Sequence, residues 1–210
     1  KGFGKAAGIP AATWASGGSL NTARDQLAGA GTQTLAIACG GNAPPGNQVV
    51  TERYDGSSWT EVNDLNTARF AVTGFGTTTA GVAANGREPS VSSSAEDWDG
   101  TSWTASGNLN TARGDASASQ TAPSTDGIIF IGSTGNHTNT VTNTEAYNGT
   151  SWTEVADLSQ KRYRGMGGGT GASAICATGY TGTARSSVTE EWATTATPTT
   201  LAKITEGQLF

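Results

Sequence analysis

Three near-copies of a single twelve-residue phrase dominate this sequence and narrow the choice of fold. TERYDGSSWTEV begins at Thr51, AEDWDGTSWTAS begins at Ala95, and TEAYNGTSWTEV begins at Thr144. A supersecondary unit that recurs in this way buries its faces only by packing against its neighbours. We therefore predict a repeat architecture.

A second phrase fixes the length of the repeat. LNTAR occurs three times and LSQKR once, and each phrase ends in an arginine, which gives Arg24, Arg69, Arg113 and Arg162. Successive arginines are 45, 44 and 49 residues apart. A period of about 45 residues, with aromatic and glycine signals in every unit, is typical of β-propeller blades. The 30 glycines and the 14% charged residues also suit short strands joined by tight turns.

Each unit reads as four strands, which we call a to d from the inside of the blade outward. Strand a follows the arginine and is rich in small residues, and strand b is one of LAIACGG, AGVAANG, GIIFIGS or SAICATG. Strand c carries a glutamate two residues before an aromatic residue, and strand d carries a tryptophan. Asp55-Gly56 and its equivalents in the next two units predict a type I′ turn between strands c and d.

The two ends of the chain predict how the ring closes. Trp14 stands at the strand d position, but no strands a to c precede it, and the fourth unit has Thr197 where its tryptophan is expected. We therefore predict an all-β, four-bladed propeller closed by the N-terminal strand, which removes the free sheet edge. This gives a lead-in over 1–11, a propeller over 12–197 and a C-terminal tail or linker over 198–210. The alternative is a fragment of a larger ring.

The repeat resembles the kelch repeat in its glycine-ended strand b, the aromatic residue of strand c, the tryptophan of strand d and the arginine before strand a. More narrowly, LNTAR, GTQT, TExYDGxSWT and the tail ITEGQLF look like kelch-like repeats of marine bacteriophage virion proteins. That resemblance implies a structural protein of a virion, such as a tail fibre or appendage that takes part in host attachment.

Composition disfavours several classes of function. The net charge is −5 and the 12 basic residues are scattered, so we expect no binding to nucleic acid. No run of about 18 apolar residues exists, so we expect no membrane insertion. His137 is the single histidine, which disfavours a catalytic triad or a multi-histidine metal site. We predict that the protein is not an enzyme and needs no metal or cofactor.

Residues that recur in every unit have two readings. The glutamates and arginines could line a channel that holds a ligand, or they could form one ion pair per blade, and we favour the ion pair because architecture recurs in all blades. The same reasoning makes the strand d tryptophans packing residues. The predicted structural residues are Trp14, Trp59, Trp103, Trp152, Arg24, Arg69, Arg113, Arg162, Glu52, Glu96, Glu145 and Glu190. Cys39 and Cys176 lie in apolar strands, where buried thiols are favoured over a disulfide.

Binding is expected where the repeats differ most, in the loops between strands b and c. These loops should emerge on the same face as the connections from strand d to the next strand a. The candidate binding residues are Asn42, Asn47, Arg87, Glu88, Asn136, His137, Asn139, Tyr180 and Arg185.

Three functions remain open at this point. The first is a non-catalytic virion module, located in the virion and oligomeric within an assembly, whose partners are other virion proteins or a host-surface glycan or protein. The second is a carbohydrate-binding, lectin-like propeller with an extracellular location. The third and least favoured is a hydrolase or lyase that uses carboxylates in the channel.

Overall fold

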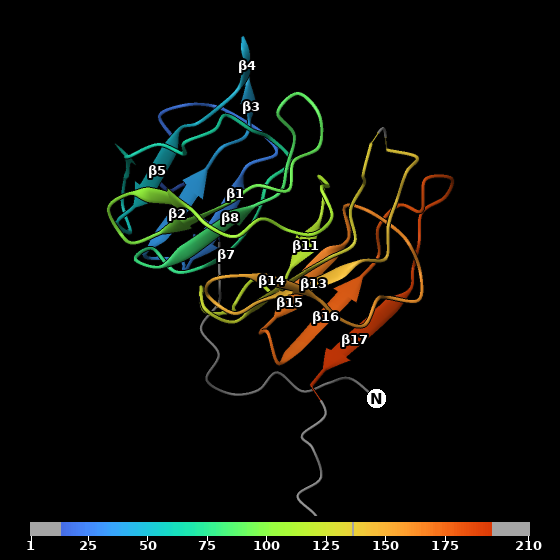
Figure 1. Cartoon of the computed structure of the whole chain (residues 1–210). Helices are drawn as coiled ribbons and strands as arrows, with labels where there is room; N and C mark the ends of the chain where they lie inside the picture. The colour runs from blue at the N-terminus through green and yellow to red at the C-terminus, as the bar shows by residue number, and fades with distance from the viewer. Residues whose placement is uncertain (1–13, 136, 195–210) are drawn as a thin grey trace, which may run out of the picture.

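The computed structural model describes residues 14–135 and 137–194, and it is an all-β fold (Figure 1). The described residues form four antiparallel blade sheets, one for each predicted repeat, and a separate two-stranded sheet. In each sheet, neighbours in sequence are neighbours in space, so every sheet is a simple meander. No helix that is long and apolar enough to cross a membrane occurs in this part of the chain.

The first two sheets have four strands each. The first blade contains β1 (Ala28–Gly31), β2 (Ala36–Cys39), β5 (Thr51–Tyr54) and β6 (Trp59–Val62). The second contains β7 (Thr73–Gly76), β8 (Gly81–Ala84), β9 (Ala95–Trp98) and β10 (Trp103–Ala105). A small hairpin of β3 (Asn42–Ala43) and β4 (Gly46–Asn47) projects from the first blade.

The third and fourth sheets differ in strand number. The third blade contains β11 (Ser117–Ala118), β12 (Gly127–Phe130), β13 (Thr144–Tyr147) and β14 (Trp152–Glu154). The fourth contains β15 (Met166–Gly169), β16 (Ser173–Ala177) and β17 (Thr189–Ala193). Within the described residues, β17 is therefore an edge strand without a fourth neighbour.

The first strands of all four blades surround a cavity of about 220 Å³ on the axis, to which β1, β7, β11 and β15 all contribute. Small residues allow this convergence. A Cβ atom at Gly167 would lie only 2.5 Å from the carbonyl oxygen of Ala118 in the third blade. Together with the four sheets, this arrangement is a four-bladed β-propeller.

Backbone hydrogen bonds near the axis join successive blades. The amide of Ala71 donates to Gln26 O at 2.9 Å, that of Asp115 to Ala71 O at 3.2 Å, and that of Arg164 to Asp115 O at 3.0 Å. All four residues adopt the left-handed conformation, with φ between 53° and 56°. Among the described residues, no backbone hydrogen bond joins the fourth blade to the first.

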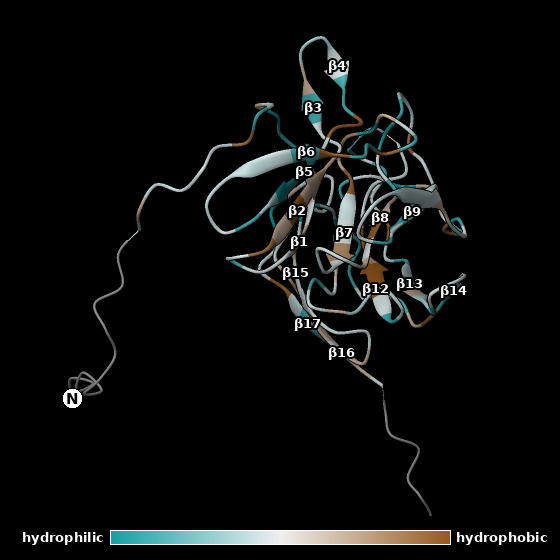
Figure 2. Ribbon diagram, turned by 90° about the vertical axis from the view of Figure 1, so that its left-hand side faces the viewer, coloured by the Kyte–Doolittle hydropathy of each residue, from teal (hydrophilic) through white to brown (hydrophobic). Residues whose placement is uncertain are grey.

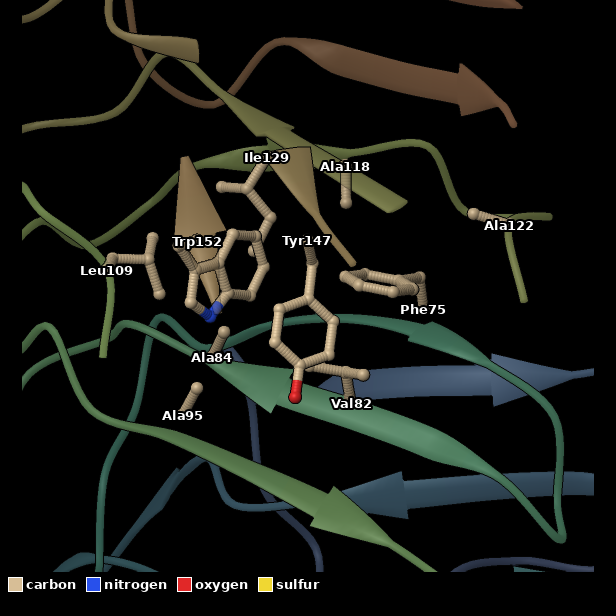
Figure 3. Close-up of a cluster of buried hydrophobic side chains, with 10 residues drawn as sticks. All are labelled: Phe75, Val82, Ala84, Ala95, Leu109, Ala118, Ala122, Ile129, Tyr147 and Trp152. Atoms are coloured by element: carbon tan, nitrogen blue, oxygen red, sulfur yellow. The ribbon is translucent and has the colours of Figure 1, made fainter. Parts of the chain in front are cut away.

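Apolar side chains fill the space between neighbouring blades. Trp152 and Tyr147 of the third blade pack with Phe75 and Val82 of the second in one buried cluster (Figure 3). An equivalent cluster around Trp103 joins the first and second blades. The strand β12, which is brown in Figure 2, contributes the buried side chains of Ile128, Ile129 and Phe130. Cys39 and Cys176 are buried free thiols, as predicted, and burial raises the pKa of Cys39 to about 12.

The predicted arginine–glutamate pair forms in each blade and joins the segment before the first strand to the third strand. Its side chains are almost completely buried in the first three blades. The pairs are Arg24–Glu52, Arg69–Glu96 at 2.7 Å, Arg113–Glu145 at 2.9 Å and Arg162–Glu190 at 3.2 Å.

The predicted type I′ turns are wrong. The loop between β5 and β6 has four residues, 55–58, and of its first two residues only Gly56 has a positive φ, whereas a type I′ turn needs two such residues. Asp55 Oδ1 instead accepts the amide protons of Ser57 at 2.9 Å and Ser58 at 2.8 Å. This Asx turn satisfies the loop amides through the carboxylate, so it needs only one left-handed residue.

The predicted closure by the N-terminal strand is also wrong for its described part. Trp14 is fully exposed, and residues 14–16 form no strand and do not pair with β17. Closure requires the fourth and first blades to lie side by side. In the described residues, backbone hydrogen bonds near the axis join the first blade to the second, the second to the third and the third to the fourth, but none joins the fourth to the first. The first described residues instead extend away from the blades (Figure 2). Residues 1–13 and 195–210, which include the predicted lead-in, Thr197 and the tail, lie outside the described residues.

Candidate functional site

The loops between the second and third strands of all four blades lie at one end of the propeller and point to the top of Figure 1. Each loop begins with an isolated β-bridge to the residue that follows the repeat arginine. These bridges are Asp25–Asn42, Phe70–Arg87, Gly114–Ser133 and Tyr163–Tyr180. The amide of Leu65 also donates to Val49 O at 3.0 Å, so the connections between blades share this face with the loops, as predicted.

Asp115 lies at the centre of the charged groups on this loop face. Its carboxylate is 2.8 Å from Arg164 Nε, 3.4 Å from Arg87 Nη2 and 3.5 Å from His137 Nδ1. The Asp115 side chain is only 4% exposed, whereas the Arg164 side chain is 53% exposed. One buried carboxylate thus holds two guanidinium groups, and the Arg164 guanidinium still reaches solvent.

Three rings lie beside this charge cluster. His137 stacks on Tyr163 with ring centroids 5.1 Å apart, and Tyr163 meets the ring of Tyr180 edge-on at 5.8 Å. Arg164 Cζ lies 5.5 Å from the centre of the Tyr163 ring, within the range of a cation–π contact. Tyr163 is buried, so it acts as a support that orients the half-exposed side chains of His137 and Arg164.

A hollow of about 210 Å³ adjoins the cluster near the axis. Gln26 and Ala71 line one part of it, and Asp115 and Arg164 line another. The hollow is lined mainly by apolar side chains, with Gln26, Asp115 and Arg164 as its polar residues. The exposed guanidinium and the half-exposed imidazole beside it can bind a polar or anionic group by hydrogen bonds and charge. We name Asp115, Arg87, Arg164, His137, Tyr163 and Tyr180 the Asp115 cluster.

The structure brings some of the predicted binding residues into this cluster and leaves others at its rim. Arg87, His137 and Tyr180 belong to it. Asn47 Nδ2 donates to Arg87 O at 3.3 Å, which connects the first loop to the second.

The remaining predicted residues lie in the same loops but outside the cluster. Asn42 pairs with Asn47 across the small hairpin, and Arg185 bridges Tyr180 within the fourth loop. Glu88 donates its amide proton to Ser90 O at 2.7 Å, and Asn139 O accepts the amide proton of Thr134 at 2.9 Å. Asn136 lies outside the described residues.

Sequence reasoning missed Asp115, Tyr163 and Arg164. They stand one or two residues after the repeat arginine, where the four units read Asp25-Gln26, Phe70-Ala71, Gly114-Asp115 and Tyr163-Arg164. This pair of positions varies as much as the loops do. The difference between repeats at these two positions is therefore the sequence signal that marks them.

Metal ligation finds no support in the described residues, which contain no group of three or more His, Cys, Asp or Glu side chains placed to hold an ion. Comparison with protein families and with curated proteins gave no match to this chain. The propeller fold therefore stands on the structure, and its function has to be argued from the loop face.

Proposed function

We propose that this protein is a non-catalytic binding and structural module of a bacteriophage virion, a kelch-like propeller from a tail fibre or appendage. In this proposal the loop face contacts the host surface or a neighbouring virion subunit. The sequences of the repeats are the reason for proposing a virion protein, and the structure is the reason for choosing the loop face as the binding surface.

The observation that carries the proposal is the convergence of four unlike loops at one end of a rigid scaffold. Residues shared by all blades, such as the arginine and the glutamate, form an ion pair within each blade and therefore have a structural role. The variable residues, in contrast, meet around Asp115, where charged groups reach solvent. Loops on a fixed framework are the usual place for recognition.

The virion part of the proposal has a direct test. Mass spectrometry of purified virus particles from the source of this sequence should detect its peptides in constant proportion to the capsid protein. Detection only in the cell lysate, and not in the particles, would contradict a virion role.

The binding part is tested with variants of the loop face. Arg164→Ala should weaken attachment of the labelled protein to host cells or to purified virions at least about tenfold, because it removes the exposed charged group of the cluster. Arg53→Ala is the matched control, since Arg53 is an exposed arginine on the central part of β5. If both variants lose attachment equally, or if neither variant loses it, the loop face is not the binding surface.

A carbohydrate-binding, lectin-like propeller is the second candidate. The specific observation in its favour is the amide and hydroxyl content of the same loops, which contain Asn42, Asn47 and Asn139. A glycan array separates the two proposals. Selective glycan binding that Arg164→Ala abolishes supports the lectin reading, and an array without signal, together with attachment to virions, supports the first.

A further inference from the structure

Trp103 and Trp152 of the outer strands each fill a site provided by the blade before their own. Trp103 of the second blade packs with Ile37 and Cys39 of the first, and its Nε1 donates to Thr51 Oγ1 at 3.0 Å. Trp152 of the third blade packs on Val82 and Ala84 of the second, where Ala95 stands in the place of Thr51 and Trp152 Nε1 has no hydrogen-bond partner. The interface between blades is therefore completed by an indole ring.

The third blade provides the same site, but no tryptophan occupies it in the described residues. A cavity of about 170 Å³ lies between the third and fourth blades, and it is lined by Ile128, Phe130, Thr144, Leu158, Cys176 and Trp192. These positions correspond to those around Trp103, with Thr144 in the place of Thr51.

Thr144 supplies an independent sign of the missing ring. Its side-chain hydroxyl is buried and has no hydrogen-bond partner, whereas the equivalent hydroxyl of Thr51 accepts the indole proton of Trp103. A buried hydroxyl without a partner carries a desolvation cost. The cavity thus has both the shape-setting neighbours and the free acceptor of an indole site.

Trp14 has the right position in sequence to supply the ring. It stands six residues before Leu20, as Trp103 stands six residues before Leu109. Gly18 packs so closely on Ser57 of the first blade that a Cβ atom there would clash with it. Gly107, at the same distance in sequence from Trp103, packs in the same way on Thr150 of the third blade. Trp14 therefore has the position of a strand d tryptophan in a unit that comes directly before the first blade.

In the part of the chain that the structure describes, no blade covers either end of the series. Tyr54 and Trp59 of the first blade are only partly buried, whereas Trp98 and Trp103, their equivalents in the second, are buried. At the other end, β17 has a free edge beside the empty cavity. The chain's own Trp14 is fully exposed and not paired with that edge.

We propose that the Trp14 segment of a second copy completes the fourth blade. The first blade of one copy packs on the fourth blade of the next and repeats the interface already present between blades within the chain. The segment around Trp14 adds to the free edge of β17. Its indole fills the cavity and donates its proton to Thr144 Oγ1. Because the two contacting surfaces differ, the contact is head-to-tail.

Sedimentation equilibrium over a wide range of protein concentration tests this proposal. The wild type should associate reversibly, and Trp14→Ala should weaken association at least about 30-fold, as for a buried tryptophan anchor. Trp14→Ala should fold normally, since Trp14 is exposed in the single copy. Thr144→Val keeps the shape of the site but removes the acceptor, so it should weaken association about three- to tenfold.

Thr104→Ala is the control, because Thr104 is exposed on β10 of the second blade, away from both end blades, and should leave association unchanged. A wild type that stays monomeric at every concentration would overturn the proposal, whether Trp14 remains free or folds back onto its own fourth blade. Association that survives Trp14→Ala would overturn it as well. So would association that depends on Trp14 but not on Thr144, since the indole would then lie elsewhere.

Discussion

Replacing Arg69 by methionine tests whether the buried ion pairs hold the blades together. Arg69 Nη2 is 2.7 Å from Glu96 Oε1, and Arg69 Nη1 donates to Ser94 O at 2.9 Å. Glu96 Oε2 also accepts the backbone and side-chain N–H groups of Asn66, at 2.8 and 2.7 Å. Methionine retains much of the side-chain length but removes the charge and the donors.

The expected cost follows from what the substitution leaves behind. The Arg69 side chain is completely buried and that of Glu96 is 4% exposed, so Arg69→Met leaves a carboxylate without its countercharge in the interior. Breaking a buried pair in this way costs about 3–5 kcal/mol of unfolding free energy. We expect the lower half of that range, because Asn66 still donates to the carboxylate. The double variant Arg69→Met/Glu96→Gln should cost less than the two single variants together.

Urea denaturation, monitored by tryptophan fluorescence, measures these changes in unfolding free energy. Arg53→Met is the matched control, because Arg53 is exposed, and it should change the unfolding free energy by less than about 0.5 kcal/mol. A cost below about 1 kcal/mol for Arg69→Met would refute the reasoning. Additive costs in the double variant would show that the two side chains do not depend on each other.

Three further predictions concern the same framework. Trp103→Ala should cost about 3–5 kcal/mol in thermal or urea unfolding, while Trp14→Ala should cost almost nothing in dilute solution, and equal costs would contradict the exposure of Trp14. Thr51→Val should cost about 1–3 kcal/mol, because the buried indole N–H of Trp103 loses its acceptor, and a neutral result would mean that water replaces it. Burial raises the pKa of Glu52, but hydrogen bonds from Arg24 and from nearby backbone amides outweigh burial, so the folded pKa lies below 4.5. Glu52 therefore stabilises the fold above pH 4.5 and loses this effect as the pH falls through its folded pKa, and Glu52→Gln should flatten the acid limb of a stability–pH curve.

Much of the fold could be predicted because local chemistry and long-range packing agree in this chain. The phrases around Trp59, Trp103 and Trp152 predicted the third and outer strands of three blades, and the recurrence of arginine with glutamate predicted one ion pair per blade. Both signals depend on repetition, which one sequence displays without an alignment. The ring closure failed for the opposite reason, since the spacing of Trp14 identifies its strand type but not the blade that receives it.

The candidate site was predicted only in part. The variable loops were expected to carry recognition, and Arg87, His137 and Tyr180 do meet on one face. Asp115 and Arg164 were missed because they lie at the start of strand a, where the inner position of the strand suggested packing. Both residues adopt the left-handed conformation, which the residue type does not predict for Arg164.

The ion pair inside each blade has a consequence for how such a chain can change in length. Arg69 and Glu96 belong to one repeat, as do Arg113 and Glu145. A duplicated or deleted unit therefore contains both partners of its ion pair. The tryptophan of a unit packs on its own unit and on the unit before it, so an inserted copy finds the same neighbour surface that its parent found. Unequal recombination between the near-identical LNTAR segments would therefore add or remove whole blades in frame, and the loop of each new blade would be free to diverge.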